Sequence, residues 1–180
     1  MNQVKIHYKT FELYISYEKI CNVVEKLAEQ MNEDLKGKAP LFLCILNGSF
    51  MFAAELFKRI NLIETEISFV KLASYNGEKT TGNVKQLIGL NANIEGRTVV
   101  VLEDIVDTGI TIDHIAEQLK ALNPKEVKIA TLLLKPDALQ KKVQLDYVGL
   151  EIPNDFIVGY GLDYDGYGRN LLDIYSVIKN

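Results

Sequence analysis

The sequence predicts an α/β domain in which a mostly parallel, twisted sheet is flanked by helices. Two fully apolar runs, at residues 41–46 and 99–102, are typical of strands buried on both faces of a parallel sheet. A segment with helical period follows each run, as expected when crossover helices join parallel strands. A length of 180 residues favours one domain, large enough to cover both faces of the sheet.

The N-terminal third is expected to form part of the structural scaffold. Residues 5–15 alternate loosely and suit an edge strand or an arm. Ser16 is a candidate N-cap for a helix whose apolar stripe runs over residues 20–35 and ends near Gly37. A strand at residues 41–46 follows and leads through a short glycine-containing turn into a helix near residues 50–57.

The rest of the chain predicts further strands and one more helix. Alternation at residues 66–72 indicates a strand with one wetter face, and a second strand resumes at residues 84–88 after a polar stretch. A helix begins at Thr111, with an expected buried stripe of Ile112, Ile115, Leu119 and Leu122. Further strands are expected at residues 127–134, 147–153, 156–160 and 171–178, with a surface segment at 136–146.

Composition excludes several classes of function. A formal net charge of −4 argues against a nucleic-acid binder, which needs a basic face. No apolar run approaches membrane-spanning length, and the N-terminus lacks a signal-peptide pattern, so a cytoplasmic location is expected. Cys21 and Cys44 lack metal-site spacing and suit small buried hydrophobes.

The run from Glu103 to Thr111 has the composition of a ligand site at a strand's carboxyl edge. The Thr108–Gly109 turn and the following helix start offer free backbone N–H groups and hydroxyls to a phosphate. Glu103 and Asp104 would repel that phosphate, so they are expected to hold ribose hydroxyls or a Mg²⁺ ion. A phosphate site beside a site for two hydroxyls predicts a ribose 5-phosphate compound as the ligand. Asp107 stays free for proton transfer to or from the group attached to the sugar.

Simpler interpretations of this run remain. Asp107 or Thr108 could only cap the helix, although capping needs one such residue and the run holds three carboxylates. Neither G-x-G-x-x-G nor G-x-x-x-x-G-K-[ST] is present there, so a Rossmann fingerprint and a P-loop are excluded.

The run Glu103-Asp104-Ile105-Val106-Asp107-Thr108-Gly109-Ile110-Thr111 resembles the phosphoribosyl diphosphate (PRPP) motif of type I phosphoribosyltransferases, in detail the hypoxanthine-guanine branch. The resemblance implies a single domain with a small hood, built from the N-terminal arm and about residues 150–180. It implies Mg²⁺ as cofactor and transfer of phosphoribosyl from PRPP to N9 of a 6-oxopurine. The residues implied to bind ribose phosphate are Glu103, Asp104, Asp107, Thr108, Gly109, Ile110 and Thr111, with Asp107 catalytic.

The resemblance also assigns a pyrophosphate site and a lid. Leu46, Asn47 and Gly48 match a loop that binds pyrophosphate through backbone amides and contains a non-proline cis peptide, here Leu46–Asn47. Asn47 replaces the family's usual lysine, which removes one positive charge. Arg169 matches a guanidinium that clamps pyrophosphate. Ser74 and Tyr75 open a lid, about residues 74–83, that would exclude water during transfer.

The purine pocket is likewise implied by the resemblance. Lys135 would donate to the purine 6-oxo group, because an ammonium group only donates hydrogen bonds. Phe156 would stack on the base, and Ile157 would offer backbone groups to its edge. Asp163 would read the 2-position and help Glu103 and Asp104 hold Mg²⁺.

Other functions stay open. A phosphoribosyltransferase for xanthine would keep the central motif, and a nucleotide-sensing RNA-binding regulator could share the fold. A Mg²⁺-dependent phosphohydrolase would normally need D-x-D spacing, whereas this run has D-x-x-D. The apolar pattern around residues 50–57 favours self-association as a homodimer or homotetramer.

Overall fold

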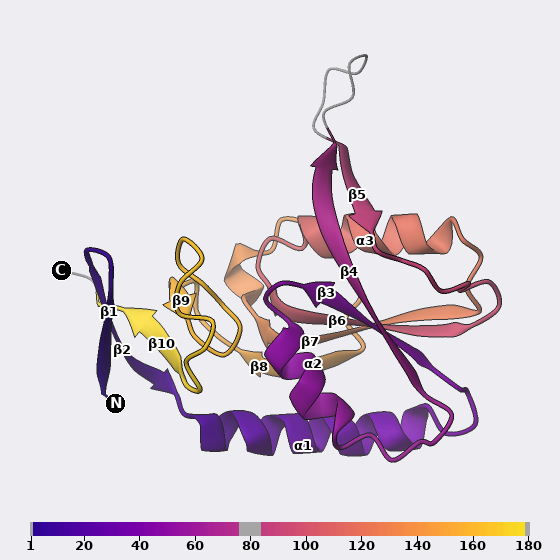
Figure 1. The fold of residues 1–180 in the computed structure, drawn as a ribbon, viewed down its shortest axis with the longest axis horizontal. Helices are drawn as coiled ribbons and strands as arrows, with labels where there is room; N and C mark the ends of the chain where they lie inside the picture. Colours follow the sequence, from indigo (N-terminus) through magenta and orange to yellow (C-terminus); the bar gives the residue numbers. More distant parts are fainter. Residues whose placement is uncertain (1, 76–83, 179–180) are drawn as a thin grey trace.

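The computed structural model describes residues 2–75 and 84–178, which form two sheets and three α-helices (Figure 1). The main sheet has the spatial order β5-β4-β3-β6-β7-β8. Its neighbouring strands pair in parallel except β5, which runs antiparallel to β4. The prediction of a mostly parallel sheet is therefore confirmed. Its strands are β3 (Leu41–Leu46), β4 (Glu66–Tyr75), β5 (Val84–Ile88), β6 (Thr98–Val106), β7 (Glu126–Leu134) and β8 (Tyr147–Glu151).

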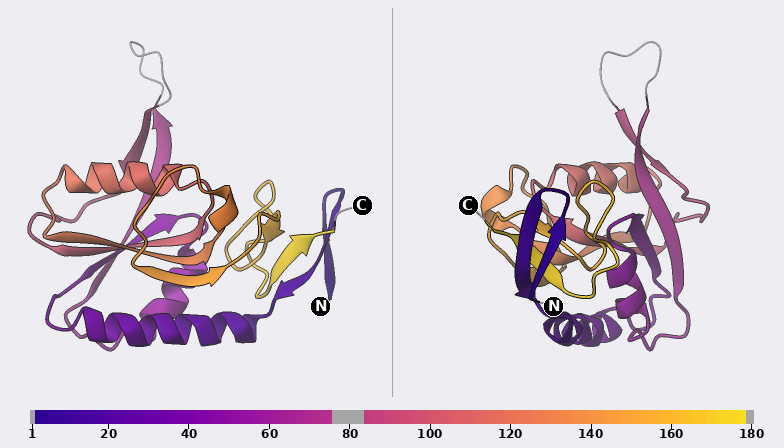
Figure 2. Two further views of the ribbon diagram at one scale, coloured as in Figure 1. Left: turned by 180° about the vertical axis from the view of Figure 1, so that it is seen from behind. Right: turned by 60° about the vertical axis from the view of Figure 1, so that its left-hand side comes forward.

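Helices cover both faces of the main sheet, as Figures 1 and 2 show. Helices α1 (Tyr17–Asp34) and α2 (Phe50–Phe57) lie on one face, and α3 (Ile110–Lys120) lies on the other. Successive residues of β3 point to opposite cores: Phe42 joins the cluster with α1 and α2, whereas Leu43 joins the cluster with α3. A strand buried on both faces needs apolar residues at every position, which explains its unbroken apolar sequence.

Helix α1 begins and ends close to the predicted positions. Ser16 is its N-cap, and the Ser16 hydroxyl accepts a hydrogen bond from the Lys19 N–H at 3.3 Å. The chain leaves the helix just before Gly37, which has a φ of +73°. Five side chains of one stripe are buried against the sheet: Ile20, Val24, Leu27, Ala28 and Met31.

The two ends of the chain build a second, four-stranded sheet, which we call the hood. It contains β1 (Gln3–Ile6), β2 (Lys9–Ile15), β10 (Ile174–Val177) and β9 (Ile157–Val158), in that order. Strand β10 pairs antiparallel with β2, so that Val177 lies opposite Phe11. The hood lies toward the end of the main sheet where β3 finishes (Figure 1) and has a small core of Phe11, Val158 and Tyr175.

Several element boundaries differ from the sequence prediction. Strand β6 continues through Glu103 and Asp104 to Val106, because its pairing with β7 continues to Leu134. Leu122 lies beyond α3 and is 47% exposed, so its place in the buried stripe was wrong. The strand expected at residues 156–160 is limited to β9, because Gly159 and Tyr160 adopt positive φ angles of +105° and +49°.

Two further expectations concern the lid and membrane spans. Ser74 and Tyr75 end β4, where their backbones pair with Lys85 and Val84. The rest of the expected lid, residues 76–83, lies outside the described residues. No helix within residues 2–75 and 84–178 is long and apolar enough to cross a membrane.

Candidate functional site

The candidate site lies at the edge of the main sheet where β3, β6 and β7 end. The three strands are parallel neighbours, so the segments that follow them meet at one edge. This topology brings together the turn at Asn47–Gly48, the acidic run of β6 and Lys135. Residues far apart in the sequence thus meet where the sequence pattern predicted a ligand site.

Glu103 and Asp104 form a buried acidic pair, with 8% and 9% of their surfaces exposed. Asp104 Oδ1 accepts a hydrogen bond from the Ile105 N–H at 2.8 Å, whereas Glu103 Oε2 has no partner among the described residues. Burial, with the adjacent Asp104 charge, raises the pKa of Glu103 well above its ordinary range. Burial also raises the pKa of Asp104, and the nearby Arg169 charge opposes that rise.

The acidic pair fits a cation that a substrate helps to hold. Two adjacent buried carboxylates, one with an unpartnered oxygen, leave negative charge that a divalent ion would neutralise. The described residues contain no cluster of three or more metal-ligating side chains. Mg²⁺ commonly binds proteins through one or two carboxylates and completes its coordination with substrate oxygens and water. Glu103 and Asp104 could supply these two protein ligands.

A cavity of about 170 Å³ lies against the acidic run and the start of α3. Gly109 is the N-cap of α3, with a φ of +78°, so neither Asp107 nor Thr108 occupies the N-cap position. The Thr108 hydroxyl nevertheless accepts a hydrogen bond from the Ile110 N–H, the first of the helix, at 3.4 Å. The next N–H groups of a helix start have no partner within the helix and can bind an anion. The cavity is lined by Glu103, Asp104, Ile105, Val106, Asp107, Thr108, Gly109, Thr111 and Ile112.

The segment at residues 139–141, which we call the brace, holds this turn from outside. The backbone N–H groups of Gln140 and Lys141 donate to the Thr108 carbonyl at 2.9 and 3.1 Å. The Lys141 ammonium lies 3.4 Å from a carboxylate oxygen of Asp113 in the first turn of α3. Sequence reasoning gave residues 136–146 no role beyond a surface segment, and these contacts have no local sequence signal.

Lys135 and Asp107 form an ion pair inside the site. The Lys135 ammonium lies 3.2 Å from Asp107 Oδ2 and 3.5 Å from the amide oxygen of Asn154. Lys135 is only 7% exposed, and its backbone N–H donates to the Val106 carbonyl at 2.9 Å. Two residues predicted to act on a base and its proton thus lie side by side. Asn154 had not been predicted as a site residue.

Two glycines let the backbone approach closely at the predicted pyrophosphate loop. The Leu46–Asn47 peptide is cis, as the family resemblance implied. A Cβ atom at Gly48 would collide with Oδ2 of Asp104, and a Cβ atom at Gly161 would collide with the carbonyl oxygen of Gly48. Only glycine fits at these two positions, where the loop after β3 touches both the acidic pair and the hood.

Arg169 lies over the same region, paired with another predicted site residue. Its Nη1 donates to the Gly161 carbonyl at 2.7 Å, and its Nη2 lies 2.7 Å from Oδ1 of Asp163. The other oxygen of Asp163 accepts a hydrogen bond from the Gly166 N–H at 2.7 Å. Arg169 therefore lies near the acidic pair, where its charge acts on Asp104, and Asp163 is joined to this region through Arg169.

Phe156 and its neighbours form an aromatic cluster on the hood. The Phe156 ring is 41% exposed and lies 5.5 Å from the Tyr164 ring, centroid to centroid. The Lys9 ammonium lies 5.2 Å from the Phe156 centroid and 5.4 Å from that of Tyr164. Ile157 is buried in the core, so only its backbone remains for a ligand. Lys9 and Tyr164 were not foreseen from the sequence.

The chain is similar to known phosphoribosyltransferases over most of its length. The family model described as "Phosphoribosyl transferase domain" matches residues 15–165. A hypoxanthine-guanine phosphoribosyltransferase of Streptococcus thermophilus is 42% identical over 161 residues, 89% of each chain. A hypoxanthine phosphoribosyltransferase structure from Staphylococcus aureus is 37% identical, with a TM-score of 0.85 and coverage of 93% of this chain and 91% of that one. A Bacillus anthracis hypoxanthine-guanine phosphoribosyltransferase structure is 36% identical, with a TM-score of 0.83 and coverage of 92% and 96%.

Proposed function

The chain belongs to the phosphoribosyltransferase family, and from this membership we propose that it is a hypoxanthine-guanine phosphoribosyltransferase of purine salvage. The reaction transfers the 5-phosphoribosyl group from PRPP to N9 of hypoxanthine or guanine and yields IMP or GMP and pyrophosphate. The observation that carries the proposal is the cavity that lies against both the buried acidic pair and the start of α3. Such a cavity suits a ribose 5-phosphate group.

The sugar phosphate is proposed to bind along β6 and the following turn. Residues 107–111 take the 5-phosphate through backbone N–H groups and the two threonine hydroxyls. Glu103 and Asp104 hold the ribose hydroxyls and are the residues that would hold Mg²⁺, which supplies positive charge for the departing diphosphate. Binding energy from the 5-phosphate, remote from the bond that breaks, positions C1 of the ribose.

Pyrophosphate is proposed to leave past Gly48 and Arg169. The backbone amides of Leu46, Asn47 and Gly48 face the diphosphate, and Arg169 exchanges its Asp163 partner for phosphate oxygens. Asn47 contributes no charge, so Arg169 supplies more of the positive potential here. Asp163, once released from Arg169, is available to Mg²⁺ and to the 2-position of the base. Ser74 and Tyr75 are retained as proposed lid residues.

The base is proposed to lie between Phe156 and the Lys135–Asp107 pair. Phe156 stacks on the purine, the Ile157 backbone meets its edge, and the Lys135 ammonium donates to the 6-oxo group. When the N9–C1 bond forms and the C1–oxygen bond to diphosphate breaks, the purine N7 proton passes to Asp107. The Lys135–Asp107 distance of 3.2 Å supports a pair in which the lysine stabilises the carboxylate until the base arrives.

An assay of PRPP and Mg²⁺ with each purine in turn tests the proposed function. We expect nucleotide formation with hypoxanthine or guanine, and loss of turnover by about 10²-fold or more in Asp107→Asn, as for a lost general base. The variant should still bind PRPP, which calorimetry measures. Turnover with xanthine alone would change the base assignment. Release of inorganic phosphate from PRPP without purine would indicate a phosphohydrolase instead.

Self-association and a cytoplasmic location complete the proposal. Phe50, the first residue of α2, is 41% exposed and Phe69 of β4 is 47% exposed, whereas the helix otherwise buries Phe52, Ala53 and Leu56. Exposed phenylalanines favour a homodimer or homotetramer, which light scattering of the purified chain tests. Cell fractionation tests the location.

A further inference from the structure

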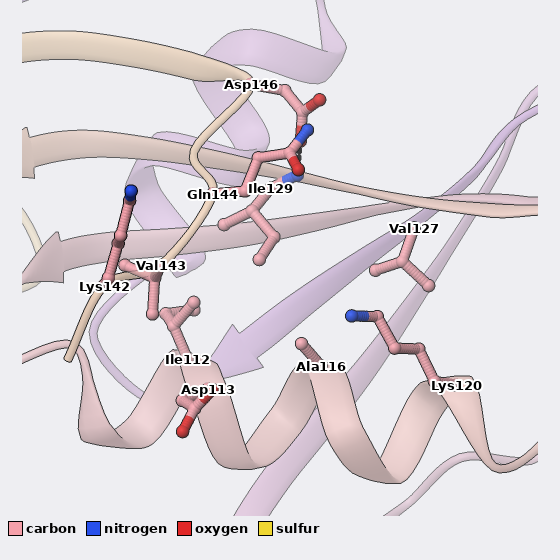
Figure 3. Close-up of a pocket in the computed structure, with 10 residues that line it drawn as sticks. All are labelled: Ile112, Asp113, Ala116, Lys120, Val127, Ile129, Lys142, Val143, Gln144 and Asp146. Atoms are coloured by element: carbon pink, nitrogen blue, oxygen red, sulfur yellow. Dashed lines mark hydrogen bonds between the residues drawn. The ribbon is translucent and has the colours of Figure 1, made fainter.

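A second cavity, of about 290 Å³, lies on the α3 face of the main sheet (Figure 3). Its walls come from α3, from β7 and from residues 142–146, the chain that leads into β8. None of the predicted site residues lines it. The apolar part of its surface consists of Ile112, Ala116, Val127, Ile129 and Val143, and the polar part of Asp113, Lys120, Lys142, Gln144 and Asp146.

The acidic residues of this cavity have cationic partners. Asp113 pairs with Lys141 at 3.4 Å, and Asp146 pairs with Lys128 at 3.5 Å. A carboxylate oxygen of Asp146 also accepts the Ile129 N–H at 2.8 Å. These contacts neutralise the negative charge of the rim.

Two cations of the cavity have no such partner. Within the part of the chain that the structure describes, neither Lys120 nor Lys142 makes an ion pair or a side-chain hydrogen bond. Figure 3 shows the two lysines at opposite ends of the cavity, with the Lys120 amine extending over Ala116 toward its middle. The cavity therefore has a mixed polar and apolar surface between two exposed, unpaired ammonium groups, which present a net positive potential to a ligand.

We propose that this cavity is a second ligand site, which binds a small amphipathic anion. The ligand is an apolar ring or branched chain that carries one carboxylate, sulfonate or phosphate group. Its apolar body lies on Ala116 and Val127, and its anionic group forms an ion pair with the ammonium group of Lys120 or Lys142. The ligand must be small, because the cavity volume of about 290 Å³ is at the lower end of the range for ligand pockets, which begins at about 300 Å³.

The second site shares its walls with the proposed phosphate turn, and this part of the inference rests on the proposed function. Ile112 lines both cavities. The chain that lines the second site at Lys142 continues directly from the brace, which donates two hydrogen bonds to the Thr108 carbonyl. A ligand bound between α3 and residues 142–144 contacts α3 and the chain that directly follows the brace. We therefore expect occupancy of either site to change the affinity of the other, and by thermodynamic linkage the two factors are equal.

The full chain, titrated with the fluorescent probe 8-anilinonaphthalene-1-sulfonate, tests the site itself. We expect saturable binding that weakens by roughly tenfold, or 1.4 kcal/mol, in the double variant Lys120→Gln with Lys142→Gln. The substitution Ala116→Leu, which fills the floor, should weaken it as well. The matched control is Lys125→Gln, since Lys125 is exposed and lies outside the cavity. Equal probe affinity in the wild type, the double variant and Ala116→Leu overturns the site.

Repeating the titration with saturating IMP tests the link to the turn. We expect the probe affinity to change with IMP in the wild type, and IMP affinity to change by the same factor with saturating probe. If neither affinity changes, the link is overturned. Turnover without probe should be equal in the double variant and Lys125→Gln. If IMP does not bind at all while the lysine variants still weaken the probe, the proposed function fails and the second site stands.

Discussion

The buried carboxylate of Glu103 destabilises the ligand-free fold, although the same group is proposed to bind the ligand. Its carboxylate is buried, and one oxygen has no partner among the described residues. Burial raises the pKa of Glu103, so the native chain binds this proton more tightly than the unfolded chain. The free energy of unfolding therefore falls as pH rises from the ordinary glutamate value near 4.5 toward the raised native value.

Replacement of Glu103 by glutamine should stabilise the ligand-free protein at neutral pH. The glutamine amide has nearly the shape of the carboxylate and carries no charge. We expect Tm to rise by about 2–4 °C, equivalent to roughly 1 kcal/mol in a chain of this length. The gain should shrink as pH falls toward 4.5, where wild-type Glu103 is itself protonated. Calorimetry from pH 5 to pH 8 measures the effect.

The same variant should lose its response to ligand. PRPP with Mg²⁺ should raise the Tm of the wild type and leave that of Glu103→Gln almost unchanged, since the variant lacks one proposed ligand. Glu29→Gln is the matched control, because Glu29 is an exposed residue of α1. A Glu103→Gln protein less stable than wild type at neutral pH would contradict the charge argument.

Gly48 should tolerate no side chain. A Cβ atom there meets Asp104 Oδ2, so Gly48→Ala must displace either the acidic pair or the loop after β3. We expect turnover to fall by about 10²-fold, the cost of a displacement near 1 Å at a reacting centre. Gly96→Ala is the control: Gly96 has a φ of +69° and open space around it, so alanine costs stability and leaves turnover intact. Steady-state kinetics and thermal melts separate the two effects.

At this scale the residue pattern alone could predict only the proximity of sequence neighbours, and site residues from other elements came from the family resemblance. Glu103, Asp104 and Asp107 form one chemically unusual run, so their proximity needed no fold. The pairing of Lys135 with Asn154 and the placement of Lys9 over Phe156 depend on the packing of separate elements. Such contacts leave no local pattern in a single sequence.

The brace is the element whose function is least visible in the sequence. Its N–H groups satisfy the Thr108 carbonyl, which fixes the turn that is proposed to receive the 5-phosphate. Gln140→Pro removes one donor, and we expect KM for PRPP to rise by about fivefold, equivalent to roughly 1 kcal/mol for one hydrogen bond. Turnover at saturation and KM for the purine should change little.

A proline four residues further along the chain, at Gln144, provides the control. The Gln144 N–H makes no hydrogen bond with the described residues, and its side chain is exposed, so Gln144→Pro should leave KM for PRPP unchanged. Equal effects of the two prolines on KM would mean that general distortion of the segment, and not the lost donor, is responsible.

Element types were easier to predict than element ends. The unbroken apolar runs identified β3 and β6, and the helical stripe identified α3. The end of β6 could not be predicted from its own residues, because acidic side chains are atypical of a buried strand and its extent is set by pairing with β7. Positive φ angles at Gly159 and Tyr160 likewise shortened β9 against its apolar composition.

For the whole molecule, the hood joins the two ends of the chain, and this pairing has no local signal. From its own residues the N-terminal segment was predicted as an edge strand or an arm, and only the family resemblance joined it to about residues 150–180 as a hood. In the structure β2 lies between β1 and β10. Main-sheet strands follow from composition, but the register of Phe11 against Val177 spans nearly the full chain. Antiparallel pairing between such distant segments cannot be predicted without knowing how the helices between them pack.

Phe11→Ala should loosen the hood and leave the main sheet folded. Phe11 is fully buried in the hood core, so we expect a loss of about 3–5 kcal/mol of local stability, typical for removing a buried ring. Hydrogen exchange should speed up in β9 and β10 while β6 stays protected. Leu13→Ala, at a position 40% exposed in the same strand, is the control. Equal acceleration in β6 would show that both sheets unfold together.

The glycine-to-glycine contact between Gly48 and Gly161 has a mechanical consequence. Main chain touches main chain there, and no side chain lies between the hood and the loop after β3 to absorb a displacement by changing rotamer. A movement of the chain at Gly161 toward the loop after β3 would therefore push that loop directly. A base that displaced Phe156 and the chain around Gly161 would in this way shift the segment past which diphosphate is proposed to leave.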